Sequence, residues 1–310
     1  SLVGMAAPAM LMFGTEEQKL AHLPTMLTGT TGWCQVFSEP GAGSDLAGLA
    51  CRAELDGDEW VVNGQKVWNS SAAHADKGLL LARTRPEAPK HKGITFLLID
   101  MHADGVEVRP LVQAHGASDF CEVFLQDVRV PVDAVLGEVD QGWGPARMVM
   151  AGESTIIGGG GVDRFHELSL MARDRGRLDD PVIRQRLAWC YSKCQIMGFL
   201  GQRVLTQFLA GHHPGPDAAI GKLQWSEYHR VVTELAMDIM GADAMFWDGR
   251  KPPSSFGADD GGAANSQSSW IGTFLNARAG TIYAGSSQIQ RNIIGEMILG
   301  LPKEPKPTPK

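Results

Sequence analysis

The feature that most constrains the fold is a change in the spacing of apolar residues near residue 140 of this 310-residue chain. From about Trp33 to Leu136, short runs alternate apolar and polar residues between turn-forming residues, which is typical of β-strands. From Gly142 onward the apolar residues recur at helical spacing. The chain is therefore predicted to be an α+β protein in which a β domain precedes a helical one.

Turn residues divide the β region into short strands. Asp56-Gly57 lies between the alternating runs Cys51–Leu55 and Glu59–Val62 and predicts a hairpin, and Asn63-Gly64 marks the end of the second run. Further runs cover residues 78–82, 93–99, 106–112 and 120–130. Strands at this spacing predict a central antiparallel barrel or sandwich of about one hundred residues.

Helical patterns flank the β region on both sides. Thr15 and the acidic pair Glu16-Glu17 predict a helix start, and Leu23-Pro24 predicts its end, so the chain opens with the end of a helical domain. Four long helical segments follow near residues 142–174, 181–211, 215–241 and 268–299, which predicts a C-terminal four-helix bundle. The expected division is 1–30 for the helical remnant, 31–138 for the β domain, 139–302 for the helical domain and 303–310 for a tail.

Composition excludes several classes of protein. Thirty-five acidic against 28 basic residues give a net charge of -7, which argues against nonspecific nucleic-acid binding. No stretch approaches the ~18 apolar residues that a membrane-spanning helix needs, and no signal peptide is recognisable. The five cysteines are dispersed as in a reducing compartment, so a cytoplasmic location is expected. The nine histidines form no metal-binding motif, and no metal is expected.

Three segments carry residues suited to a planar, phosphate-bearing ligand. The run 37–45 (FSEPGAGSD) offers bare backbone and hydroxyl donors, and the run 63–72 (NGQKVWNSSA) sets a tryptophan beside small polar residues. The run 281–292 (TIYAGSSQIQRN) predicts a serine-capped helix N-terminus. Taken alone, the first segment is equally well explained by an ordinary β-turn. For the second and third segments alone, ordinary structure is the better explanation: a core tryptophan and a capped helix.

Together, in this order and spacing, the three segments resemble the signatures of the acyl-CoA dehydrogenase family, over residues 10 to 302. The resemblance implies a flavoprotein of lipid metabolism and fatty acid β-oxidation that binds FAD between its β domain and C-terminal helices. It implies that FAD meets Gln35, Phe37, Ser38, Gly43 and Ser44 along the first segment, Trp68 and Ser70 on the second, and Ser286 and Gln288 on the third. It also implies that Arg175 reaches the pyrophosphate of a partner subunit's FAD, although the family's Arg-x-x-Phe-Gly pattern is not preserved here.

The resemblance also directs the search for a catalytic base. The α proton of a thioester is weakly acidic, so a carboxylate must be held against the α carbon. Many family members carry this Glu where the present chain has Ala284, and others carry it on the first long C-terminal helix, where this chain has Glu153. Apolar neighbours favour Glu153 as the base over an ordinary solvated helix carboxylate, and Ser154 replaces the Arg that usually follows.

The same resemblance implies an acyl-CoA substrate, an electron-transfer flavoprotein as acceptor, and a homo- or hetero-oligomer, as dimer or tetramer. Family members typically begin with a complete helical domain, so this chain is expected to be either truncated or a naturally short subunit. Some bacterial relatives work as heteromeric complexes on bulky thioesters, including steroid side chains. Two alternatives to an active dehydrogenase therefore remain: a catalytically silent FAD-binding or structural subunit, and an oxidase that passes electrons to oxygen.

Overall fold

A computed structural model describes residues 3–159, 164–211, 216–245 and 267–303 of the chain. The chain divides into two compact units, Ser1–Glu153 and Ser154–Lys310, and each unit is described by itself. The predicted tail lies outside the described residues except for Lys303. No helix within the described ranges is long and apolar enough to cross a membrane.

Three helices belong wholly or in part to the first unit: α1 (Val3–Phe13), α2 (Glu16–Thr28) and the first part of α3 (Trp143–Gly159). The predicted start of α2 is confirmed, because Thr15 and Gln18 cap it reciprocally. The predicted end at Pro24 is wrong, since the helix runs through this proline to Thr28. Gly29 ends it instead, with a φ of 72° and an amide directed at the last turn.

Seven strands form one sheet in this unit: β1 (Trp33–Val36), β2 (Arg52–Asp56), β3 (Glu59–Ser70), β4 (Lys77–Arg83), β5 (Ile94–Asp100), β6 (Val106–Leu111) and β7 (Phe120–Pro131). The predicted α+β class is confirmed, as is the β2–β3 hairpin at Asp56-Gly57. The sheet is mixed rather than wholly antiparallel, because β1 pairs with β4 in parallel and a single parallel bridge joins β2 to β4. The β2–β3 hairpin lies between β1 and β4 in the sequence, so β4 can run in the same direction as β1.

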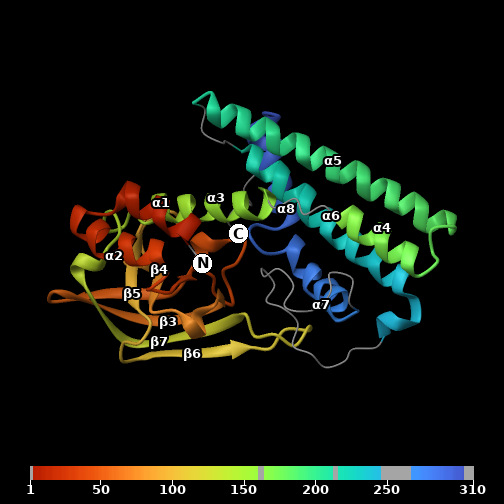
Figure 1. Cartoon of the computed structure of the whole chain (residues 1–310). Helices are drawn as coiled ribbons and strands as arrows, with labels where there is room; N and C mark the ends of the chain where they lie inside the picture. Colours follow the sequence, from red (N-terminus) through yellow and green to blue (C-terminus); the bar gives the residue numbers. More distant parts are fainter. Residues whose placement is uncertain (1–2, 160–163, 212–215, 246–266, 304–310) are drawn as a thin grey trace, which may run out of the picture. The chain divides into compact units, whose positions relative to one another are not determined.

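The sheet curls into a half-barrel with a core on each face. One core joins the sheet to the helices and includes Met10, Phe37, Phe96 and Val149. The other core lies on the opposite face. In Figure 1 the helices of the first unit lie along one side of this sheet.

Asn63-Gly64 lies inside β3 and does not end it, which corrects the predicted strand boundary. The register with β7 shifts between Val62 and Gly64, as at a β-bulge. A Cβ on Gly64 would lie 2.7 Å from the Cβ of Cys51, the residue directly before β2, which pairs with β3. The close approach of the two backbones, rather than a turn, therefore requires glycine here.

The second unit is helical and is built around α6 (Asp217–Met240), beside which α5 (Pro181–Leu209) runs in Figure 1. Asp180 caps α5 and Pro181 occupies its first turn, as the sequence predicts. The other helices are α4 (Arg164–Asp174), α7 (Gln267–Ala277) and α8 (Ser287–Ile293). Their shared core includes Leu168, Leu187, Val232 and Trp270.

The predicted helix over 268–299 is interrupted. It consists of α7, a 3-10 turn at Arg278–Thr281, α8 and a final π-helical turn at Ile294–Ile298. Ala284 and Gly285 adopt φ values of 51° and 81°, which no α-helix can contain. Apolar spacing alone could not reveal this break, because apolar residues continue on both sides of it.

Candidate cofactor-binding site

The loop that follows β1 exposes its backbone. Residues Glu39 and Ala42 exchange backbone hydrogen bonds of 3.1 and 3.0 Å, which closes a tight turn over Pro40 and Gly41. A Cβ added to Gly41 or Gly43 would meet nothing within 4 Å, and Gly43 and Ser44 are exposed. The loop therefore presents bare backbone to a ligand, as expected from its composition.

A buried ion pair underlies this loop. Lys66 of β3 is fully buried, and its Nζ lies 2.8 Å from Oε1 of Glu39, whose side chain is 8% exposed. Sequence analysis did not predict that Lys66 and Glu39 form an ion pair. The available signal was strand alternation, because Trp60 and Val62 face inward and the same spacing puts Lys66 on the inward side.

Trp68 is displaced from the regular pleat of β3. The register with β7 shifts between Lys66 and Asn69, and Trp68 there adopts a φ of 63°. A bulky residue in the left-handed region is strained, and such strain gathers at ligand-binding positions. The Trp68 side chain is 60% exposed and contacts the ring of Phe120 in a T-shaped arrangement, at 6.1 Å between centroids. Trp68 is therefore not the buried core tryptophan of the alternative interpretation.

Backbone carbonyls of the first segment are directed onto β3. The side-chain amide of Asn69 donates to the Gln35 carbonyl at 2.8 Å, and Lys66 Nζ donates to the Phe37 carbonyl at 3.0 Å. The Val67 amide donates to the Ser38 carbonyl at 2.9 Å. The structure thus brings the first two predicted segments together within one unit. The three backbone carbonyls named here already accept hydrogen bonds from β3.

These residues fit a flavin ring. Half-buried Ser38 and Ser70 supply hydroxyl groups, and Trp68 supplies an exposed indole for stacking. The Oδ1 atom of Asn69, between Trp68 and Ser70 in the chain, is buried and accepts no hydrogen bond from the described part of the chain. A buried acceptor without a donor calls for a ligand or a water, and a flavin ring carries an N–H group as well as carbonyls.

Cysteines near this site are unsuited to nucleophilic chemistry. Burial raises the pKa of the Cys51 thiol to about 11, and Lys66 only partly opposes this effect. Burial raises the pKa of Cys34 to about 12. Both thiols therefore stay protonated at neutral pH.

The third predicted segment lies in the second unit. Ser286 caps α8, and its Oγ accepts from the Ile289 amide at 3.3 Å, while Gln288 is exposed on the same helix. The turn before α8 is held by Lys222, a fully buried residue of α6. Its Nζ donates to the carbonyls of Gly280 and Gly285 at 3.0 and 2.8 Å. The capped helix N-terminus is present, and sequence analysis missed the lysine that positions it.

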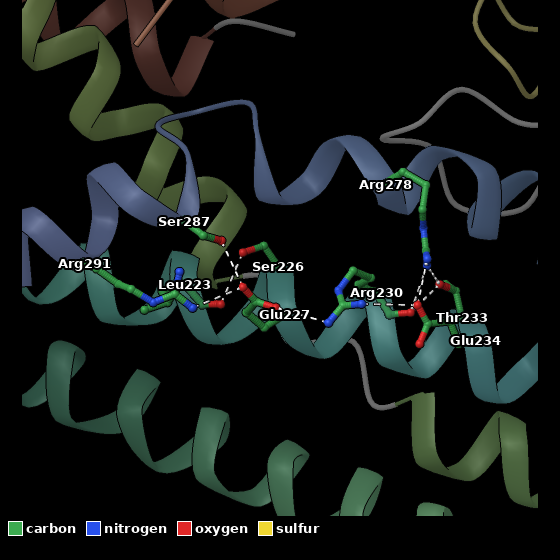
Figure 2. Close-up of polar contacts among 9 residues, drawn as sticks. All are labelled: Leu223, Ser226, Glu227, Arg230, Thr233, Glu234, Arg278, Ser287 and Arg291. Atoms are coloured by element: carbon green, nitrogen blue, oxygen red, sulfur yellow. Dashed lines mark hydrogen bonds and ion pairs between the residues drawn. The ribbon is translucent and has the colours of Figure 1, made fainter. Parts of the chain in front are cut away.

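Figure 2 shows a ladder of charges that joins α6 to the segment containing α7 and α8. Glu227 accepts from Ser287 Oγ at 3.1 Å and pairs with Arg291 at 3.4 Å. Two turns along α6, Glu234 pairs with Arg278 at 2.8 Å. Spacing along the sequence could not show this ladder, because its two sides lie more than forty residues apart.

Arg175 pairs within its own unit. Its guanidinium lies 2.6 Å from Oδ2 of Asp243 and donates to the Met240 carbonyl at 3.4 Å. These contacts tie the end of α4 to the turn after α6. Binding of a pyrophosphate by Arg175 remains a prediction, and it would require exchange of Asp243 for the phosphate oxygens.

Glu153 lies on α3 and is half-buried. The helix packs closely there, since a Cβ on the preceding Gly152 would lie 3.2 Å from the Gly4 carbonyl of α1. One turn earlier, Val149 is fully buried. The side chain of Ser154 lies outside the described residues. The structure thus places the predicted base at a partly covered position beside a helix crossing.

Comparison with known proteins gives consistent matches over the chain. The family model "Acyl-CoA dehydrogenase, middle domain" matches residues 34–128, and the model "Acyl-CoA dehydrogenase, C-terminal domain" matches residues 140–299. The chain is 40% identical over 308 residues to acyl-CoA dehydrogenase IpdE1 of Mycobacterium tuberculosis, covering 97% of this chain and 75% of the relative.

Solved structures give the same result. The structure titled "Tcur3481-Tcur3483 steroid ACAD" superposes with a TM-score of 0.85 at 32% identity, covering 97% of this chain and 76% of that one. The ChsE4-ChsE5 complex from Mycobacterium tuberculosis superposes with a TM-score of 0.82 at 28% identity, covering 97% of this chain and 77% of that one.

Proposed function

Since the chain belongs to the acyl-CoA dehydrogenase family of FAD-dependent oxidoreductases acting on CH–CH groups, we propose that it introduces an α,β double bond into an acyl-CoA thioester. The observation that carries the proposal is the arrangement in the first unit. A loop of exposed backbone lies beside a strained, exposed Trp68, and the carbonyls of this loop are turned away onto β3. That arrangement suits a flat ligand rich in carbonyl oxygens.

In this proposal, bound FAD supplies the acceptor for the hydride that leaves the β carbon. The chain's own residues orient it: Gln35, Phe37, Ser38, Gly43 and Ser44 along the loop, Trp68 and Ser70 on β3, Ser286 and Gln288 at α8, and Arg175 toward a partner's cofactor. Backbone amides and hydroxyls provide most of these contacts, which suits a chain with net negative charge.

Glu153 is the proposed base that removes the α proton. It is the single carboxylate in the sequence of α3, and the alternative family position is occupied by Ala284, which cannot accept a proton. Hydrogen bonds to the thioester oxygen must stabilise the developing enolate while the proton is transferred.

The relatives suggest a substrate class and partners. The names of two structural neighbours each join two proteins, as in the ChsE4-ChsE5 complex, and the name of the other includes "steroid ACAD". We infer by this similarity that the chain acts on bulky CoA thioesters, such as those of steroid side chains, together with a homologous subunit. An electron-transfer flavoprotein is the proposed acceptor. A catalytically silent subunit is the competing function, favoured by Ser154 at the position of the usual Arg.

Anaerobic titration of the FAD-loaded protein with a panel of acyl-CoA thioesters tests the proposal. Wild-type protein should lose its yellow colour as the flavin is reduced. The Glu153→Gln variant should bind FAD normally but fail to bleach, and the Glu138→Gln variant should behave as wild type, because Glu138 is exposed just before α3. Unimpaired bleaching of Glu153→Gln would refute its role, while yellow wild-type protein that never bleaches would favour the silent subunit. Flavin spectra should be recorded with and without a co-expressed homologous subunit.

A further inference from the structure

The buried pair of Lys66 and Glu39 satisfies every polar group that it contains. An ammonium has three donors, and Lys66 Nζ directs them at Glu39 Oε1, the Phe37 carbonyl and the Leu81 carbonyl, at 2.8, 3.0 and 2.7 Å. The carboxylate of Glu39 also accepts from the Ala50 and Cys51 amides at 2.7 and 2.9 Å. One pair therefore fixes the beginning of the exposed loop to Ala50 and Cys51, just before β2, and anchors both to β4.

Stability is a weak explanation for such a pair. The loss of hydration on burial offsets most of the attraction, and apolar replacements of buried ion pairs are often neutral or stabilising. What the pair does locally is to hold the Phe37 carbonyl inward, toward Lys66. The peptide groups of this loop can then offer donors rather than an acceptor to the outside.

We propose that Lys66 and Glu39 are positioning residues that set the donor pattern of the loop Phe37–Ser44 toward the flavin. This inference rests on the proposed function, because that loop is the one assigned to FAD. Without the Lys66 ammonium, the Phe37 peptide is free to turn its carbonyl outward and to repel the carbonyl edge of the flavin ring. Neither residue touches the reacting atoms in this proposal; both act through the loop.

The test compares FAD binding by three variants with that of wild type. Lys66→Met removes the ammonium, Lys66→Met/Glu39→Gln removes both charges, and Glu39→Asp keeps both charges but shortens the carboxylate. The control is Lys77→Met on β4, whose partner Asp100 lies 2.9 Å away in an exposed pair of the same sheet. The readouts are the FAD dissociation constant from quenching of flavin fluorescence, the visible circular dichroism of bound flavin, and thermal unfolding of the FAD-free protein.

Wild type and Lys77→Met should bind FAD alike. The double variant should fold but unfold below the wild-type temperature, since it leaves no unpaired buried charge but removes the donor of the Phe37 and Leu81 carbonyls. Its dissociation constant for FAD should nevertheless rise about 10-fold, as expected from the loss of one hydrogen bond to the flavin, and the circular dichroism of bound flavin should change. Glu39→Asp should show an intermediate loss of affinity.

Wild-type affinity and spectrum in a folded double variant would overturn the positioning role. So would failure of all three variants to fold, because the pair would then serve folding alone. These results differ from failure of the proposed function, in which the wild-type protein itself does not bind FAD.

Discussion

A buried lysine helps to hold the turn before α8, and the consequence of removing it can be worked from the structure. Lys222 is fully buried, and its Nζ donates to the carbonyls of Gly280 and Gly285 at 3.0 and 2.8 Å. Replacement by Met keeps most of the apolar stem but removes this donor from both carbonyls, and the Gly285 carbonyl keeps a longer bond of 3.3 Å from the Gln290 side-chain amide. A buried acceptor that loses its partner costs about 1–3 kcal/mol.

The free energy of unfolding should fall by about 2–4 kcal/mol in Lys222→Met. The variant no longer has to bury an ammonium group, and this gain offsets part of the cost at the two carbonyls. At about 2–4 °C per kcal/mol, this corresponds to a fall of about 4–16 °C in the melting temperature of the second unit. Ser286 follows Gly285 directly, so any FAD contact made by Ser286 should weaken in the same variant.

Differential scanning calorimetry of the FAD-free protein measures the change. The matched control is Lys193→Met, because Lys193 reaches its acceptor on Gln224 only at 3.4 Å and should contribute at most about 1 kcal/mol. A melting temperature for Lys222→Met that equals that of the control would refute the argument that this lysine holds the turn.

Three further predictions concern particular backbone and charge features. Ala284→Gly should raise the free energy of unfolding by about 0.5 kcal/mol. Glycine relieves about 1 kcal/mol of strain at the left-handed φ, but part of this gain is lost because glycine makes the unfolded chain more flexible. A lower melting temperature would contradict this prediction. Gly64→Ala should cost about 1–3 kcal/mol, since its Cβ would meet Cys51 at 2.7 Å, and unchanged stability would show that the strands part easily. Burial, with Arg164 and Arg278, lowers the pKa of His229 from 6.5 to about 4, so stability should fall as pH drops from about 6.5 to 4. His229→Gln should flatten that part of the pH profile, and an identical slope would exclude His229 as its cause.

Much of the fold is predictable because the strands alternate regularly and the turns are chemically marked. Asp56-Gly57 locates the β2–β3 hairpin, and Asp180-Pro181 locates the start of α5. The loop after β1 is also predictable, because its glycines and serines leave little side chain to pack. These features depend on neighbours in sequence, which is why one sequence suffices to find them.

What the sequence does not reveal depends on partners far along the chain. The bulge that exposes Trp68 arises from pairing of β3 with β7, and the Lys66–Glu39 pair forms across 27 residues. The break at Ala284 is stabilised by Lys222, which lies on another helix. Each of these features joins segments whose approach is decided only when the sheet or the bundle has formed. They are also the features that shape the candidate site.

The most direct test of the central claim is the mass of the thioester recovered after turnover. FAD-loaded protein should be incubated with a bulky acyl-CoA and an electron acceptor, together with its homologous subunit where one is co-expressed. The account predicts a product that is lighter by two hydrogens and carries its double bond between the α and β carbons. A thioester that is recovered unchanged, or hydrolysed to the free acid, would contradict it.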